Sequence, residues 1–393
     1  MVDAPIEEET KESTSKRKRL LLITTSVFIL IGLFVALYWL FVWRFEEYTD
    51  DAYVNGNMVQ ITPQVAGIVT SVNVDNTDFV EEGQVLIELD KTDNFLAFKQ
   101  SENDLAMAVR SVVQMFLKVE ELEATLEAKD AELIVAEQDY ANRVNLVDIG
   151  AVSVEEFEHV EATLKSARAS AKETYHSLQA AYAEVQGTSV STHPLVLEAI
   201  ERVKSDWISL KRCSILSPVT GYVAQRSAQL GEWVNLAQPL MAIIPLNELW
   251  VDANFKETKL ASMRIGQDAT IRSDIYGRAV TFKGKVVGIN PGTGSVFSAL
   301  PPQNATGNWI KIVQRVPVRI SLNRKQVEKN PLWLGLSMEV TVDIQDKNGE
   351  MLAESTRSQP IYRTEIYSRQ EEGIEKVIRA IIEANGGGCG RGT

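Results

Sequence analysis

One stretch near the N-terminus is uncharged and mostly apolar, and it runs from Leu20 to Trp43. It exceeds the roughly 20 residues that an α-helix needs to cross the hydrocarbon core of a bilayer. A cleaved secretory signal has a shorter apolar region, of about 7–15 residues, followed by a small-residue cleavage site, which does not follow here. The pattern therefore predicts a single transmembrane helix over residues 20–43.

The residues that flank this helix predict its orientation. Four consecutive basic residues precede it, whereas Arg44 alone follows it. Lys and Arg near a membrane span stay on the cytoplasmic side, and aromatic rings such as that of Trp43 prefer the interface. We therefore expect residues 1–19 in the cytoplasm and the chain after Trp43 on the far side of a bacterial inner membrane. The residues expected to flank the anchor are Lys16, Arg17, Lys18, Arg19 and Trp43.

Two later segments repeat each other: "PQVAGIVTSVNVDNTDFVEEGQVL" (63–86) and "SPVTGYVAQRSAQLGEWVNLAQPL" (217–240). Gly67 aligns with Gly221, and Gly83 aligns with Ala237, a departure that we expect to alter one turn. Alternating apolar residues in each copy predict strand, turn and strand. One copy is too small to bury a face alone, so we expect both to pack into one sandwich. Its halves are residues 44–91, including a lead-in strand, and residues 217–245.

The residues between the two copies have a helical pattern. Apolar residues recur every seventh position in two lines, which is typical of a coiled-coil seam. We predict an outward helix over 92–146, about 80 Å long at 1.5 Å per residue, and a return over 153–216 with a break near 187–194. An ordinary helical bundle stays open as an alternative to this hairpin of residues 92–216. The two lines are Phe98, Leu105, Val112, Val119, Leu126, Leu133, Tyr140 and Val147, and Phe157, Leu164, Ala171, Leu178 and Val185.

Short β-branched segments separated by Gly, Pro or Asn follow from Leu246 to about Ile344. This spacing predicts a small antiparallel barrel over residues 246–345. Residues 346–393 are polar and then weakly helical, and they end in "GGGCGRGT", which predicts a C-terminal extension with a flexible tail.

The composition excludes several classes of function. A formal net charge of −13 argues against a nucleic-acid partner, because phosphate binding needs a basic face. Two distant cysteines, Cys213 and Cys389, and three scattered histidines suggest neither a disulfide framework nor a metal centre. We find no Ser/His/Asp, Cys/His or paired-carboxylate pattern, so we expect no enzyme, no catalytic residue and no cofactor.

The stretch "EEGQVLIELDKTDN" (81–94) resembles the segment of a lipoyl or biotinyl carrier domain that bears the modified lysine. In the carrier motif that this stretch resembles, the modified lysine lies ten positions after the glycine. Here Lys91 comes only eight positions after Gly83. We therefore interpret the likeness as one of fold, and Lys91 as a solvated cation. A lipoyl or biotinyl carrier component of an enzyme stays open as an alternative of another class. The expected fold is α+β: one transmembrane helix, a split lipoyl-like β-sandwich, a long coiled-coil hairpin and an antiparallel β-barrel.

Four segments resemble the HlyD superfamily of membrane fusion proteins, or periplasmic adaptors, and more narrowly its EmrA subfamily. They are "TDDAYVNGNMVQITPQVAGIV", "ISLKRCSILSPVTGYVAQRS", "LWVDANFKETKLASMRIGQ" and "NPGTGSVFSALPPQNATGNWIKIVQRVPVRI". The resemblance implies an adaptor that joins an inner-membrane major facilitator pump to a TolC-type outer-membrane channel, as a ring-like homo-oligomer. An adaptor for type I protein secretion or for aromatic-acid export is the alternative in the same class, and a coiled-coil spacer is a third hypothesis.

The same resemblance implies a contact with the outer-membrane channel at the hairpin tip. The family often carries Arg, then Leu, then Ser there, and Arg143, Leu146 and Ser153 match this order with a slightly different spacing. Ser153 also begins the capping box "SVEE", which predicts a helix start after a turn at Gly150. A surface cation at Arg143 and an ordinary cap at Ser153 are the alternatives to a contact role.

Overall fold

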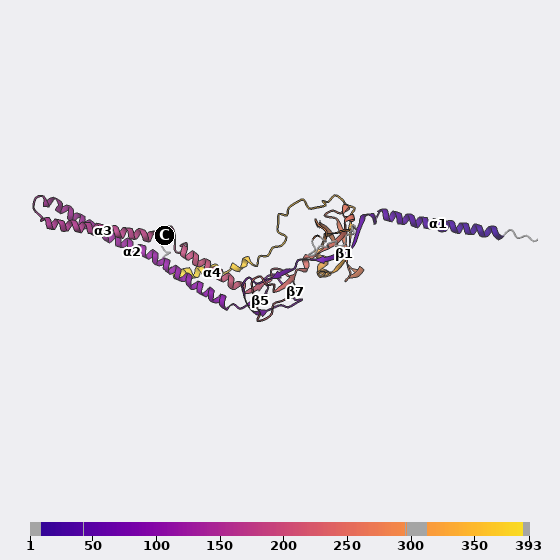
Figure 1. The fold of residues 1–393 in the computed structure, drawn as a ribbon, viewed down its shortest axis with the longest axis horizontal. Helices are drawn as coiled ribbons and strands as arrows, with labels where there is room; N and C mark the ends of the chain where they lie inside the picture. The colour runs from indigo at the N-terminus through magenta and orange to yellow at the C-terminus, as the bar shows by residue number, and fades with distance from the viewer. Residues whose placement is uncertain (1–8, 42, 295, 297–312, 388–393) are drawn as a thin grey trace, which may run out of the picture.

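The computed structural model describes the chain except residues 1–8, 42, 295, 297–312 and 388–393, and side chains are described from residue 17 on, apart from 40–43. The molecule is long: a solitary helix lies at one end, a helical hairpin at the other, and two β-domains lie between them (Figure 1). Residues 388–393 of the expected flexible tail, and residues 295 and 297–312 of the "NPGTGSVFSALPPQNATGNWIKIVQRVPVRI" segment, lie outside the described residues.

The N-terminal helix α1 (Glu9–Phe41) contains the predicted transmembrane segment. Residues 17–39 are long and apolar enough to cross a membrane, and none of the apolar window is buried against the rest of the protein. The helix ends at Phe41, and Trp43–Phe45 form a short 3₁₀ helix that leads into the first strand. An apolar helix whose described side chains between residues 17 and 39 are exposed fits a lipid environment.

The two sequence repeats form one sandwich of two four-stranded sheets, as predicted. Each sheet takes two strands from each copy, in the orders β2-β9-β7-β4 and β6-β5-β3-β8. The halves are therefore interleaved, and neither can fold alone. The first copy supplies β2 (Val59–Ile61), β3 (Gly67–Val72), β4 (Phe79–Val80) and β5 (Val85–Leu89), and the second supplies β6 (Ser214–Leu216), β7 (Gly221–Arg226), β8 (Trp233–Val234) and β9 (Met241–Ile244).

At two equivalent turns of the sandwich, one copy has glycine and the other has a different residue, yet the backbone conformation is the same. Gly83 and its counterpart Ala237 both have positive φ, 86° and 62°. Thr77 and its counterpart Gly231 do too, at 76° and 80°. The expectation that Ala237 alters its turn is therefore wrong. The sheet pairings on either side hold the chain in the left-handed region, which non-glycine residues rarely adopt.

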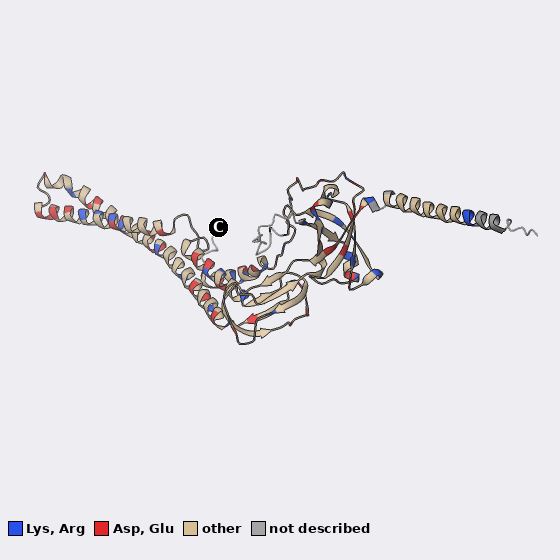
Figure 2. Ribbon diagram, turned by 45° about the vertical axis from the view of Figure 1, so that its right-hand side comes forward, with Lys and Arg blue, Asp and Glu red and all other residues tan. Residues whose placement is uncertain are grey.

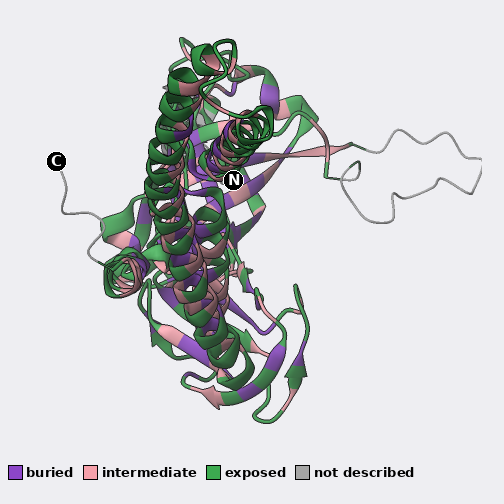
Figure 3. Cartoon of the chain, turned by 90° about the vertical axis from the view of Figure 1, so that its left-hand side faces the viewer, coloured by how far each residue is buried: buried purple, intermediate pink, exposed green. Residues whose placement is uncertain are grey.

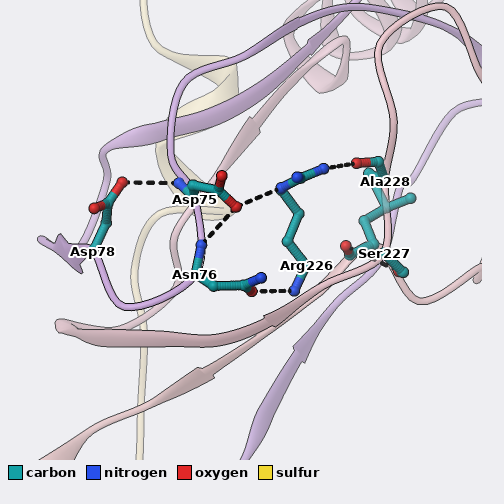
Figure 4. A network of polar contacts seen from close by, with 7 residues as sticks. Asp75, Asn76, Asp78, Arg226, Ser227 and Ala228 are labelled. Atoms are coloured by element: carbon teal, nitrogen blue, oxygen red, sulfur yellow. Dashed lines mark hydrogen bonds and ion pairs between the residues drawn. The ribbon is translucent and has the colours of Figure 1, made fainter.

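A polar network ties the two halves together across 150 positions of sequence (Figure 4). The Arg226 Nε donates to Asp75 Oδ1 at 2.9 Å, and the Arg226 backbone amide donates to Asn76 Oδ1 at 2.8 Å. The Arg226 Nη1 also donates to the carbonyl of Ala228. The hydrogen bond from Arg226, the backbone amide of Asn76 and the positive charge of Arg226 lower the pKa of Asp75. The anionic form of Asp75 is thus favoured in the folded state.

The predicted hairpin leaves the sandwich at Thr92 and returns at Arg212. Helix α2 (Thr92–Val147) goes out, and α3 (Val154–Val185) and α4 (Pro194–Arg212) return, with the break where it was predicted. The seam is confirmed: Leu105 and Val112 are wholly buried, as is nearly all of Ala171 and Leu178. Figure 3 shows the outward faces of these helices as mainly exposed.

The return helix was predicted to reach Leu216, and this end is wrong. Helix α4 stops at Arg212, and Ser214–Leu216 form strand β6. This strand pairs with β5, and Ile215 enters the sandwich core with only 7% of its surface exposed. Pairing satisfies backbone groups at the edge of β5, and another turn of helix would leave them open.

The barrel is closed and antiparallel, with strand order β1-β10-β13-β12-β11-β14. Strand β1 (Glu46–Asn55) was assigned to the sandwich as a lead-in strand, and this is wrong: it pairs with β10 and β14 and closes the barrel. Ala52 and Val54 of β1 lie in the barrel core. Closure leaves no edge strand unpaired. The other strands are β10 (Trp250–Lys256), β11 (Asp268–Ser273), β12 (Thr281–Ile289), β13 (Arg315–Leu322) and β14 (Ser337–Asp343).

The C-terminal extension returns from the barrel to the hairpin (Figure 1). Its helix α6 (Ile374–Asn385) packs against α2 and α4, with Ile374 and Ile378 buried. The short helix α5 (Arg324–Lys329) lies between β13 and β14. Short 3₁₀ helices occupy Leu246–Glu248, Glu257–Ser262, Gly277–Ala279 and Ser368–Glu371.

Candidate functional site: the hairpin tip and the membrane anchor

The hairpin tip is a six-residue turn between α2 and α3, at the end of the molecule farthest from α1 (Figure 1). The amide of Gly150 donates to the carbonyl of Val147 and the amide of Ala151 to that of Leu146, both at 3.0 Å. Gly150 has φ 68°, the left-handed conformation that commonly ends a helix. The end of α2 is therefore capped by the turn itself, and the turn has a defined shape.

Arg143 lies one turn before the end of α2 and reaches toward both helices of the hairpin. Its Nη1 is 3.3 Å from Asp139 Oδ1, and its Nε is 3.9 Å from Glu156 Oε1 on α3. About a third of its side-chain surface (32%) is exposed. Ion pairs this exposed contribute little stability, so Arg143 remains accessible to a partner while its guanidinium is held near the turn.

Ser153 is the N-cap of α3, as the capping box predicts. Its Oγ accepts a hydrogen bond from the amide of Glu156 at 3.2 Å. The side chain of Glu156 lies beside Arg143. Glu156 therefore connects the two, through its amide to Ser153 and through its carboxylate to Arg143. Arg143 and Ser153 line the same depression, of about 390 Å³. Leu146, 37% exposed, does not contribute to that depression.

Two apolar residues at the tip were not singled out from the sequence. Ile149, within the turn, is 74% exposed, and Val154, the first residue of α3, is 64% exposed. A turn around a glycine is normally polar. The apolar residues near Gly150 were therefore the sequence feature that could have identified this surface. Exposed apolar side chains next to a charged residue are typical of protein contact sites.

The anchor end carries the predicted basic cluster. Arg17, Lys18 and Arg19 are the first residues of α1 whose side chains are described, and they are exposed near the end of the helix away from the β-domains (Figure 2). The side chains of Lys16 and Trp43 lie outside the described residues. The structure thus separates the basic flank from the hairpin tip by the whole length of the molecule.

Lys91 occupies the passage from β5 into α2 and not the tip of a turn. Its Nζ is 2.8 Å from Glu88 Oε1, three residues earlier. In carrier domains a strand-to-strand turn displays the lysine, whereas here a helix of 56 residues begins at Thr92. This geometry does not favour the carrier alternative.

Two family models match this chain. "EMRA, alpha-helical hairpin domain" matches residues 92–213, and "AAEA-like beta-barrel domain" matches residues 248–345. Together they cover more than half of the sequence.

Three curated relatives match nearly end to end. Multidrug export protein EmrA of Escherichia coli is 45% identical over 353 residues, 90% of each chain. EmrA of Haemophilus influenzae is 41% identical over 378 residues, 96% of this chain and 97% of the relative. Fatty acid resistance protein FarA of Neisseria gonorrhoeae is 43% identical over 339 residues, 86% of each chain. This family consists of adaptors and not of enzymes. The chain belongs to the EmrA family of HlyD-type membrane fusion proteins.

Proposed function

We propose that this protein is the periplasmic adaptor of a tripartite multidrug efflux system. It links a major facilitator pump in the inner membrane to a TolC-type channel in the outer membrane. The observation that carries this proposal is the placement of an apolar anchor and an exposed apolar tip at opposite ends of one long molecule. The EmrA relatives, named as multidrug export proteins, support it.

The proposed topology follows from the charges around α1. Arg17, Lys18 and Arg19 stay in the cytoplasm, so the barrel, sandwich and hairpin lie in the periplasm. Strand β1 begins at Glu46, directly after the 3₁₀ helix Trp43–Phe45. This short connection puts the barrel at the membrane surface, beside the pump. The hairpin of α2 and α3 then points away from the inner membrane. Helix α2 alone spans about 84 Å at 1.5 Å per residue, which supplies reach toward the outer membrane.

The mechanism needs no chemistry at the adaptor. The protein holds the pump and the channel in line, and several copies side by side enclose a path for cargo. The names of the relatives include multidrug export and fatty acid resistance. We therefore propose hydrophobic and amphipathic toxins as the cargo class.

Deletion of the gene in its native host tests this function. We expect the deletion strain to become sensitive to hydrophobic toxins and uncouplers in a growth-inhibition panel, and a plasmid copy to restore resistance. A strain that expresses the protein and shows an unchanged profile after deletion contradicts a role in drug efflux.

A further inference from the structure

The root of the hairpin is a three-helix bundle whose third helix comes from the C-terminus. Ile374 and Ile378 of α6 are 1% and 4% exposed. They share one apolar cluster with Leu105 of α2 and Val203 of α4. Figure 1 shows α6 alongside these two helices. The last helix of the chain therefore fills a groove that α2 and α4 leave open.

Polar contacts fix both ends of α6 on the root. The Arg110 Nε of α2 donates to Asn385 Oδ1 at 2.9 Å, at the end of α6. At its start, Lys204 Nζ of α4 lies 3.5 Å from Glu375 Oε1. These contacts and the buried isoleucines set the direction and register of α6 in the groove.

The segment before α6 contacts both the sandwich and the hairpin. The Trp207 Nε1 donates to the carbonyl of Gln370 at 3.0 Å. The Thr364 hydroxyl donates to Glu82 Oε1, in the β4–β5 turn of the sandwich, at 2.9 Å. The C-terminal segment therefore spans the joint between the two domains, and the chain connects them covalently only at residues 89–92 and 212–214.

The joint itself is not closely packed. A cavity of about 960 Å³ lies between the sandwich, the hairpin root and the C-terminal segment. Its walls include Phe95 of α2, Leu216 of β6 and Ile366 of the C-terminal segment. Direct contact between the two domains includes the hydrogen bond from Asn94 Nδ2 to the Sγ of Cys213, a residue of the sandwich core. Because the cavity interrupts packing beside this contact, the C-terminal segment adds support that helps the hairpin keep one angle.

An exposed stretch of chain joins the C-terminal segment to the barrel. Residues 351–363 are exposed throughout, so they form a tether and not a packed element. Helix α6 has 12 residues, a length at which an isolated helix is marginal in water. It is therefore stable only when docked, and the tether keeps its local concentration high.

We propose that residues 364–385 form an intramolecular clasp that fixes the angle between hairpin and sandwich. Docking of α6 holds the hairpin in the position seen here, and release lets the hairpin swing about its root. The clasp thereby controls where the hairpin tip lies relative to the anchor. This inference rests on the geometry of the joint and does not depend on what the protein exports.

Distance measurements on the full chain test the clasp. Spin labels are placed at Gln229→Cys in the sandwich and Glu120→Cys in the hairpin, with Cys213 and Cys389 replaced by Ser. We expect a single narrow distance distribution in this background. Ile378→Asp, which puts a charge into the groove, widens the distribution at least twofold. Ala380→Asp puts the same charge on the exposed face of α6 and leaves the distribution unchanged.

Hydrogen exchange on the same proteins separates release of the clasp from unfolding. In Ile378→Asp we expect amides of α6 to exchange at least tenfold faster, with the barrel strands unchanged. Trp207→Phe removes the bond to Gln370 and part of the ring contact with Phe98. It gives a smaller widening and covers the case in which Ile378→Asp unfolds the root. The clasp is refuted if α6 amides become unprotected while the distance distribution stays narrow, or if α6 is unprotected in the parent protein.

Discussion

Thr77 shows how a single residue can be held against its own backbone preference. It is β-branched and has φ 76°, whereas its counterpart Gly231 takes nearly the same angle without strain. Neither the strain at Thr77 nor that at Ala237 is visible in the sequence, because the sheet pairings that impose the angle join residues more than 140 positions apart.

Exchanging Thr and Gly between positions 77 and 231 has opposite effects on stability at the two positions. We expect Thr77→Gly to raise the free energy of unfolding by about 0.5–1 kcal/mol, since relief of left-handed strain exceeds the entropic cost of glycine. Gly231→Thr lowers it by about 1–2 kcal/mol. Thermal unfolding of both variants measures this, and equal shifts in the same direction contradict it.

The Asp75–Arg226 pair makes the sandwich sensitive to acid. Because the pKa of Asp75 is lowered on folding, its contribution to stability is full above the ordinary aspartate pKa of about 4 and is lost as pH falls through the lowered value. Asp75→Asn is therefore less stable than the parent protein at pH 7, and the difference shrinks below about pH 4. Denaturant unfolding at several pH values measures it. A difference independent of pH argues against the pairing.

At the scale of elements, sequence periodicity predicted the helices and missed contacts between segments far apart in the sequence. The seven-residue repeats of apolar residues predicted the hairpin because the seam residues lie on one face of each helix. Strands β1 and β6 were misassigned because their partners lie far away in sequence: β1 pairs with β10 and β14. The docking of α6 was missed for the same reason. At the tip, the family resemblance suggested Arg143, Leu146 and Ser153 as contact residues, which stays a prediction, and it did not single out Ile149 and Val154.

The two halves of the sandwich respond differently to the same substitution. A Cβ on Gly221 would lie 2.5 Å from the carbonyl oxygen of Ile244, a backbone atom that cannot move alone. A Cβ on the equivalent Gly67 would meet Leu89 Cβ at 3.6 Å, an ordinary contact. We expect Gly221→Ala to destabilise the protein by more than about 2 kcal/mol, and Gly67→Ala by less than about 0.5 kcal/mol. Thermal unfolding distinguishes the two, and similar costs contradict the geometry.

The tip turn is the element that we expect to contact the outer-membrane channel. Ile149→Asp puts a charge on the exposed apolar surface of the turn, and we expect resistance to hydrophobic toxins to fall at least tenfold at unchanged protein level. The matched control is Ile134→Asp on α2, since Ile134 is also exposed (53%) but lies away from the tip. Growth assays with quantified expression measure the effect. Equal losses in both variants, or none in either, contradict a docking role for the turn.

At the scale of the whole molecule, the proposed function depends on the separation of the anchor helix from the hairpin tip. The anchor helix has no apolar partner within the described chain, and the tip exposes apolar residues that the fold does not use. The barrel, the interleaved sandwich and the hairpin hold these two ends apart (Figure 1). The family relationship and this geometry agree on an adaptor, and the clasp at the hairpin root is the feature that sets where the tip lies.

Photo-crosslinking in living cells tests the proposed bridge most directly. A benzoyl-phenylalanine at position 149 is compared with one at position 134, and covalent partners are identified by mass spectrometry. We predict that position 149 captures an outer-membrane channel protein and that position 134 does not. Capture of inner-membrane proteins alone by position 149, or the same partners from both positions, would contradict the claim that this adaptor reaches the outer membrane through its tip.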